Sequence, residues 1–151
     1  MSVRHNMSGF WLPAGAVAAV LAVLASAGWW LYRANQELEG KAPVSCREAV
    51  RFLQAAHPPE AAQSKRCTKG QWQTTWYNID FQTSRAEAEA WLRATYPDAR
   101  VDRDCAGADL CAQPTTPADG SDNGNADYLS VDIRFEERDF AHVHVSGGTS
   151  N

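Results

Sequence analysis

Residues 129–146 read LSVDIRFEERDFAHVHVS, and this stretch decides how the second half of the chain folds. Apolar and polar side chains alternate on both sides of a short acidic connection, which is the period-two pattern of two half-buried strands. The stretch therefore predicts a β-hairpin. If both strands bury their apolar side chains on one face, Val143 lies opposite Ile133 and Val145 lies opposite Val131.

The same register places two histidines on the polar face of the hairpin. His144 lies opposite Asp132 and His142 lies opposite Arg134, while the turn around Glu137–Asp139 holds an odd number of residues, as three-residue loops do. Two imidazoles and a carboxylate are ligand types for zinc or copper. Arg134 would repel such a cation, and exposed polar positions on a hairpin need no function. We predict no metal ion or cofactor here, and His142, His144 and Asp132 are the candidate ligands if one is bound.

Outward from the hairpin, two capping boxes mark the starts of helices, each with a serine followed three residues later by a glutamate. Ser45 and Glu48 open the first predicted helix, and Ser84 and Glu87 open the second. The second helix has one apolar stripe that should face the sheet. Its members recur at spacings of three and four: Ala88, Trp91, Leu92, Thr95 and Tyr96.

Between the two helices, Gln71–Gln82 alternates like a single strand. Its apolar face carries Tyr77, Ile79 and Phe81, and its other face carries Trp72, Thr74, Trp76 and Asn78. Exposed aromatic rings stack on sugars or anchor a partner protein, so Trp72 and Trp76 are a candidate interaction surface. The alternative is that the first helix covers this face and that both rings belong to the core.

The remaining segments complete an α+β domain over residues 45–147. Glu60–Gly70 is expected to be a loop with a small basic cluster of Lys65, Arg66 and Lys69, and a short strand is expected near Ala99–Asp104. We expect a mainly antiparallel, four-stranded sheet with two helices packed on it. Residues 112–126 are rich in turn-forming residues and are predicted to be a flexible loop, and residues 148–151 a disordered tail.

Part of that loop resembles the front half of an EF-hand calcium loop. Oxygen-bearing side chains recur at alternate positions from Asp119 to Asn123, followed by Gly124 and Asp127. Ser130 stands where a bidentate glutamate is required, and no helix is predicted on either side. A calcium-responsive loop is therefore kept only as an alternative to an ordinary polar turn.

The four cysteines, Cys46, Cys67, Cys105 and Cys111, are predicted to form two disulfides. No Cys-x-x-Cys spacing is present, so zinc and thioredoxin-like sites lose their main support. We prefer the local pairing Cys46–Cys67 and Cys105–Cys111. Four free thiols in a cytoplasmic domain are the alternative.

Residues 10–32 contain no charged side chain and are long enough for a transmembrane helix. Trp11 stands at one end and Trp29, Trp30 and Tyr32 at the other, where a span places its aromatic residues. Residues 1–9 form a short tail, and residues 33–44 a stalk or a helical continuation. The alternative is a secreted protein, because Ala25-Ser26-Ala27 has the form of a signal-peptide cleavage site.

The orientation of this span rests on the cysteines, because the basic residues on its flanks do not decide it. Disulfides form in oxidising compartments, which predicts an extracytoplasmic domain, periplasmic or extracellular. Along the span, Ala14, Ala18, Ala22 and Ser26 make a stripe of small residues through which two helices can approach closely. Self-association through this stripe is a possible partner interaction, and such stripes also arise by chance in alanine-rich spans.

Charge and missing motifs narrow the function. The chain has a net charge of −4, and every Asp and Glu lies at or beyond Glu37, which disfavours nucleic-acid binding. It has no P-loop and no Gly-x-Ser-x-Gly motif, so we predict a protein that is not an enzyme. The leading hypothesis is a single-pass membrane protein whose outer domain meets a protein partner or a cell-envelope component. The alternative is a metal- or calcium-responsive domain.

Overall fold

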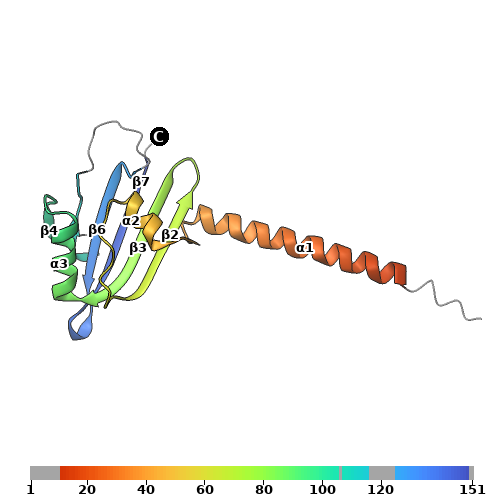
Figure 1. Ribbon diagram of the computed structural model, residues 1–151, viewed down its shortest axis with the longest axis horizontal. Helices are drawn as coiled ribbons and strands as arrows, with labels where there is room; N and C mark the ends of the chain where they lie inside the picture. Colours follow the sequence, from red (N-terminus) through yellow and green to blue (C-terminus); the bar gives the residue numbers. More distant parts are fainter. Residues whose placement is uncertain (1–10, 106, 116–124, 150–151) are drawn as a thin grey trace, which may run out of the picture. The chain divides into compact units, whose positions relative to one another are not determined.

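The structure is a computed structural model that describes residues 11–105, 107–115 and 125–149. It contains two compact units, residues 1–35 and residues 36–151. The first consists of most of helix α1 (Trp11–Leu38), drawn in red and orange in Figure 1. The stretch Gly15–Leu38 is long and apolar enough to cross a membrane, and a secretion signal near the N-terminus passes the same test. Its large apolar side chains are exposed, with Leu24 at 62%.

Helix α1 continues beyond the predicted span and ends in a glycine cap. Gly40 has a φ of 70°, a left-handed conformation that costs glycine little. The amide of Gly40 donates to the carbonyl of Glu37 at 3.2 Å, and that of Lys41 donates to Gln36 at 2.8 Å. These bonds satisfy carbonyls at the helix end that lack a partner within the helix. The predicted stalk is therefore helical as far as Leu38.

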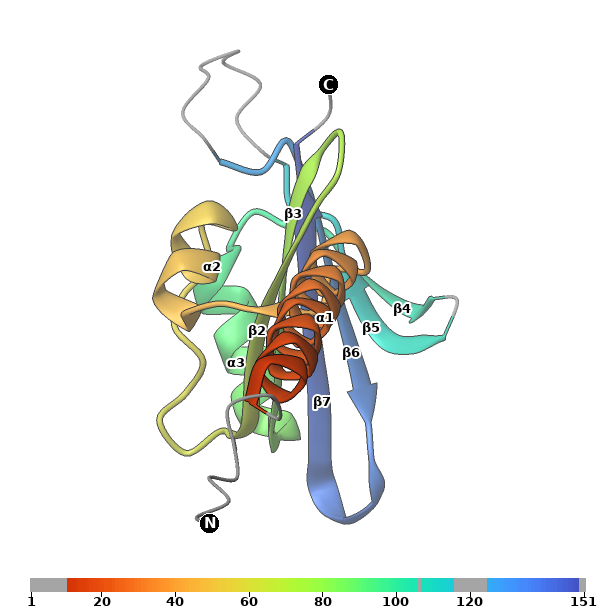
Figure 2. The ribbon, with the colours of Figure 1, turned by 90° about the vertical axis from the view of Figure 1, so that its right-hand side faces the viewer.

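The folded domain, residues 36–151, is built on one antiparallel sheet of seven strands, not the four that the sequence predicted. The strand order is β1-β2-β3-β7-β6-β5-β4, with β3 and β7 adjacent near the centre (Figure 2). The strands are β1 (Ala42–Pro43), β2 (Gln63–Gln71), β3 (Thr75–Ser84), β4 (Val101–Cys105), β5 (Ala108–Ala112), β6 (Tyr128–Phe135) and β7 (Phe140–Gly148).

Three strands were not predicted from the sequence: β1, β2 and β5. The predicted strand Gln71–Gln82 is broken by a tight turn, in which the amide of Trp72 donates to the carbonyl of Thr74 at 3.0 Å. The predicted loop before it, Glu60–Gly70, contains most of β2, whose polar sequence lacks the apolar alternation of a half-buried strand. β5 was also missed, because five residues around a cysteine are too few for a periodic signal.

The predicted hairpin is confirmed, including its register. Val143 pairs with Ile133 and Val145 pairs with Val131, and all four side chains are fully buried. The connection contains a short 3-10 turn, Glu137–Asp139. Figure 2 shows this hairpin extending past the other strands at the bottom of the view.

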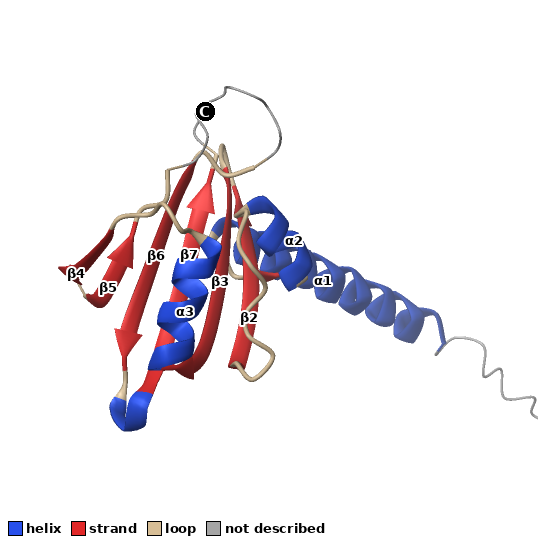
Figure 3. Ribbon diagram, turned by 60° about the vertical axis from the view of Figure 1, so that its left-hand side comes forward, coloured by secondary structure: helices blue, strands red, loops and turns tan. Residues whose placement is uncertain are grey.

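Helices α2 (Cys46–Phe52) and α3 (Arg85–Thr95) pack on the same side of the sheet (Figure 3). Both predicted N-caps are confirmed, since Ser45 accepts a bond from the amide of Glu48 and Ser84 forms the full capping box with Glu87. Between the helices and the sheet lies the core. Its largest fully buried side chains are Phe81, Leu53, Ile79, Ile133, Val131, Val143 and Val145.

Polar ends of buried aromatic side chains tie the helices to their surroundings. The hydroxyl of Tyr77 donates to Glu48 on α2 at 2.6 Å, and burial together with this carboxylate raises the pKa of Tyr77. The hydroxyl of Tyr96 donates to the carbonyl of Leu53 at 3.0 Å, and burial raises the pKa of Tyr96 to about 12. The hydroxyls of Tyr77 and Tyr96 therefore each have the partner that burial demands.

Both predicted disulfides are present. Cys46–Cys67 joins the start of α2 to β2, and Cys105–Cys111 closes the β4–β5 hairpin. Disulfides of this kind are typical of domains in oxidising compartments.

Candidate functional site

The candidate site lies on the open face, which we define as the side of the sheet opposite α2 and α3. Even-numbered residues of β3, β6 and β7 point to this face, because side chains alternate along a strand and the odd-numbered ones fill the core. One row of directly paired residues crosses four strands. It consists of Arg66 on β2, Asp80 on β3, His144 on β7 and Asp132 on β6.

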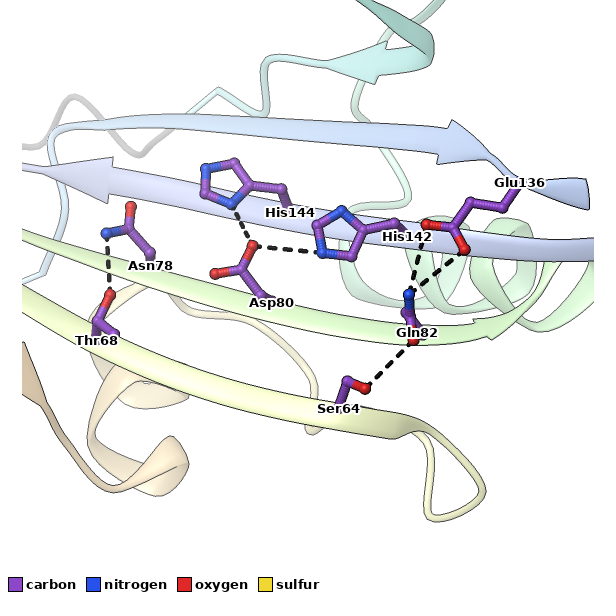
Figure 4. Close-up of polar contacts among 8 residues, drawn as sticks. All are labelled: Ser64, Thr68, Asn78, Asp80, Gln82, Glu136, His142 and His144. Atoms are coloured by element: carbon purple, nitrogen blue, oxygen red, sulfur yellow. Dashed lines mark hydrogen bonds and ion pairs between the residues drawn. The ribbon is translucent and has the colours of Figure 1, made fainter. Parts of the chain in front are cut away.

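At the middle of this row one carboxylate faces two imidazoles. Oδ1 of Asp80 lies 2.8 Å from Nδ1 of His144 and 3.7 Å from Nε2 of His142 (Figure 4). The first distance is a hydrogen bond, and the second is an ion-pair distance when His142 is protonated. The three side chains are 26–37% exposed, so the cluster is half-buried but open to solvent.

Asp80 determines the state of the His144 ring. A carboxylate only accepts hydrogen bonds, so Nδ1 of His144 carries the proton and Nε2 is left to face other groups. The hydrogen bond to Asp80 raises the pKa of His144, and the charges of Asp80 and Asp132 act in the same direction. Burial and the positive charge of Arg134 partly oppose this shift.

A second group of polar contacts lies beside the cluster. Gln82, which pairs with His142 across β3 and β7, donates to the carboxylate of Glu136 at 3.4 Å. The hydroxyl of Ser64 donates to the side-chain carbonyl of Gln82 at 3.3 Å. Figure 4 shows several polar side chains of the open face bonded to one another across neighbouring strands. Their mutual bonds hold them in fixed directions.

A cavity of about 230 Å³ lies against the cluster and is lined by Asp132, Arg134, His142 and His144. The sequence register predicted these four neighbours correctly, and the strand pairing confirms it. Asp80 was not predicted, although its place two residues after Asn78 puts it on the polar face of its strand. What the sequence could not provide was the pairing of β3 with β7, because Asp80 and His144 are separated by 64 residues.

The metal hypothesis gains no support from this geometry. Within the described residues, no group of three or more His, Cys, Asp or Glu side chains is arranged to hold a metal ion. Both imidazoles direct a nitrogen at the same oxygen of Asp80. To bind a metal ion, these nitrogens would instead have to point at one common position occupied by the ion. Most of the calcium-loop candidate, from Asp119 to Gly124, lies outside the described residues.

The two predicted surface tryptophans occupy different places, and the prediction that they share one strand face is wrong. Trp72 sits in the β2–β3 turn with 70% of its surface exposed. Trp76 lies on the open face, half-buried, with its indole across Gly70 and against Gly40. Neither ring lies beneath the first helix of the domain, because α2 covers the other side of the sheet.

The predicted basic cluster is also dispersed. Arg66 joins the row on the open face, whereas Lys65 donates to the carbonyl of Glu60 at 3.0 Å. Lys69 lies over the ring of Tyr77 at 5.6 Å from its centroid. In α1 the hydroxyl of Ser26, the last member of the small-residue stripe, donates to the carbonyl of Val23 at 2.9 Å.

Comparison with known proteins gives no identification. No protein-family model, no curated protein sequence and no solved structure matches this chain. Its function is therefore inferred from features of the chain itself: the open face, the apolar helix and the two disulfides.

Proposed function

We propose that this chain is a single-pass membrane protein whose domain lies outside the cytoplasm. There it binds a protein partner or a cell-envelope component through the open face, without catalysing a reaction. The observation that carries the proposal is the asymmetry of the sheet. One face is covered by α2 and α3, and the other presents fixed polar side chains around Asp80 and a cavity beside them.

Membrane attachment and compartment are supported by two features of the chain. Gly15–Leu38 has the length and hydropathy of a span, and its apolar side chains are exposed, which is costly in water. The two disulfides support an oxidising compartment. The secreted alternative requires cleavage after Ala27.

Peptide mapping of the protein extracted from native membranes, with free thiols blocked, tests this part. We expect both disulfide-linked peptides and an intact peptide that covers α1. A mature N-terminus at Gly28 would replace the anchor by a signal peptide. Four blocked thiols would place the domain in the cytoplasm.

The binding role is tested by photo-crosslinking in intact cells. A benzophenone amino acid is placed at Tyr128 on the open face or at Arg93 on α3, and both native side chains are exposed. We expect adducts from the Tyr128 position and none from the Arg93 position. Adducts from both positions alike, or from neither, would remove the open face as the binding surface.

A further inference from the structure

We infer that the component bound by the open face is an uncharged glycan chain, with one sugar held in the cavity between Asp132, Arg134, His142 and His144. This inference rests on the proposed function, and it chooses between the two kinds of partner left open there.

The chemistry of the cavity fits a polyhydroxylated ligand. Asp132 offers acceptors and Arg134 offers donors from alternate positions of β6, and the second ring nitrogen of His144 is not engaged by Asp80. The side chains of Arg134 and Asp132 make no hydrogen bond or ion pair within the part of the chain that the structure describes. A sugar carries neighbouring hydroxyls, each of which both donates and accepts, so one sugar can bond to the carboxylate and the guanidinium together.

The charges around the cavity favour a ligand without net charge. With His144 protonated, two positive groups, Arg134 and His144, stand beside two negative ones, Asp80 and Asp132. A polyanion would meet both carboxylates, and a polycation would meet the guanidinium and the imidazolium. A polyanion would lose the hydrogen bonds to the carboxylates, and a polycation would lose those to the guanidinium and the imidazolium, whereas an uncharged polyol can bond to both kinds of group.

The same composition argues against a protein partner. The centres of protein interfaces are depleted in charged residues and are built around apolar or aromatic anchors. On β3, β6 and β7 the open face has charged and hydrogen-bonding side chains at its centre and no aliphatic side chain among its described positions. Its aromatic residues Trp76, Tyr128 and Phe140 stand toward the ends of the strands.

The placement of Tyr128 indicates a chain of sugars. Tyr128 lies on the same strand face as Asp132, four residues away, or about 14 Å at the usual rise of about 3.4 Å. Its ring end lies over Gly148, yet half of the side chain is exposed, so an aromatic surface faces solvent. Ser130 and Ser146 form a direct cross-strand pair between the two positions. Their hydroxyls add further hydrogen-bonding groups. A ligand that reaches both ends must be an oligomer.

The test uses the full-length protein in phosphatidylcholine nanodiscs and saturation-transfer NMR. The probes are the uncharged tetrasaccharides chitotetraose, cellotetraose and maltotetraose, with fully deacetylated chitotetraose and a heparin tetrasaccharide as charged comparisons. We expect saturable binding of at least one uncharged probe and weaker binding of both charged ones. No binding of any uncharged probe at millimolar concentration, or tightest binding of a charged probe, would overturn the inference.

Matched variants locate the site. Asp132→Asn and Arg134→Gln should each weaken binding about tenfold, the usual effect of losing a charge-assisted hydrogen bond. Glu89→Gln and Arg93→Gln alter the exposed ion pair on α3 and should leave binding unchanged. Tyr128→Ala should weaken binding while Tyr128→Phe retains it. Equal weakening by the α3 variants would place the glycan elsewhere and overturn the site.

The crosslinks at Tyr128 separate this inference from the function on which it rests. Adducts that shift on glycosidase digestion support both. If only protease digestion shifts the mobility of the adducts and no sugar binds, the proposed binding function stands and the partner is a protein. No adduct and no sugar binding would remove both.

Discussion

Asp80 holds His144 through one hydrogen bond, and this contact gives the open face a dependence on pH. The groups that face His144 are Asp80, Asp132, Arg134 and the neighbouring His142. The folded-state pKa of His144 is raised above its ordinary 6.5, so the folded protein binds the proton more tightly than the unfolded chain. The resulting stability is fully present below pH 6.5 and is lost as the pH rises through the folded-state value.

We therefore predict that His144→Gln lowers the melting temperature more at pH 6 than at pH 9. The measurement is a series of thermal melts of both proteins across this range. In parallel, NMR titration should show His144 protonating above pH 6.5 in the native protein and at lower pH in Asp80→Asn, which removes the main cause of the shift. A melting difference that grew with pH would contradict the assignment.

At Gly70 the indole of Trp76 leaves no room for a side chain. A Cβ at this position would lie 2.1 Å from Cε2 of Trp76, closer than any packed atoms. Because Gly70 lies beneath a rigid indole, a methyl group there must displace the ring. We predict that Gly70→Ala destabilises the protein by about 1–3 kcal/mol, the usual cost of overpacking.

Chemical denaturation measures that cost, and a double-mutant cycle identifies its cause. In a Trp76→Ala background the methyl group meets no ring, so Gly70→Ala should cost much less there. If the substitution cost the same in both backgrounds, the effect would come from the strand itself and not from the indole.

Among the elements, the two disulfides show what a covalent constraint contributes to stability. Cys46–Cys67 spans 21 residues and joins a helix to a strand, whereas Cys105–Cys111 spans 6 residues within one hairpin. Loop-closure entropy grows with the length of the loop that a bridge closes, so the longer loop should contribute more.

We predict that the paired substitution Cys46→Ala with Cys67→Ala costs about 3 kcal/mol, and that Cys105→Ala with Cys111→Ala costs about 2 kcal/mol, on the chain-entropy model. Urea unfolding of the two double variants measures both values under identical conditions. A larger loss from the shorter loop would show that native-state packing outweighs loop length here. Cys67 is buried, so its truncation also removes a packing contact.

The elements also show which parts of the fold the sequence could predict. The β6–β7 register followed from Val131, Ile133, Val143 and Val145, because a slip by one residue would expose all of them. The N-caps followed from local serine–glutamate spacing. Strand β2 could not be predicted, because its polar sequence has few apolar side chains to set a period. The pairing of β3 with β7 could not be predicted either, because it depends on contacts between distant segments.

The same limit applies to the candidate site. The four side chains that line its cavity belong to one hairpin and could be placed together from the sequence. Asp80 comes from a strand whose neighbours no local pattern specifies. Trp72 and Trp76 were assigned to one strand because the turn between β2 and β3 contains neither glycine nor proline to mark it.

At the scale of the whole molecule, the core of the domain is built from residues of the domain itself. Every buried apolar side chain of that core lies between Ala49 and Val145. We predict that a fragment of residues 36–151 folds alone and melts cooperatively at the same temperature as the domain in the full-length protein. Circular dichroism of the two proteins provides the comparison, and an unfolded or strongly destabilised fragment would mean that α1 contributes to the domain's stability.

The sheet has two edge strands, and both are poor templates for another strand. β1 is only two residues long and ends in Pro43, which has no amide hydrogen to donate. β4 exposes charged side chains, among them Asp102 in an ion pair with Arg100 at 3.0 Å. Charged and proline-containing edges resist sheet extension between molecules. Crowding of protein copies favours the growth of cross-β aggregates. Because its edge strands resist pairing, we expect copies of this domain to stay separate under that condition.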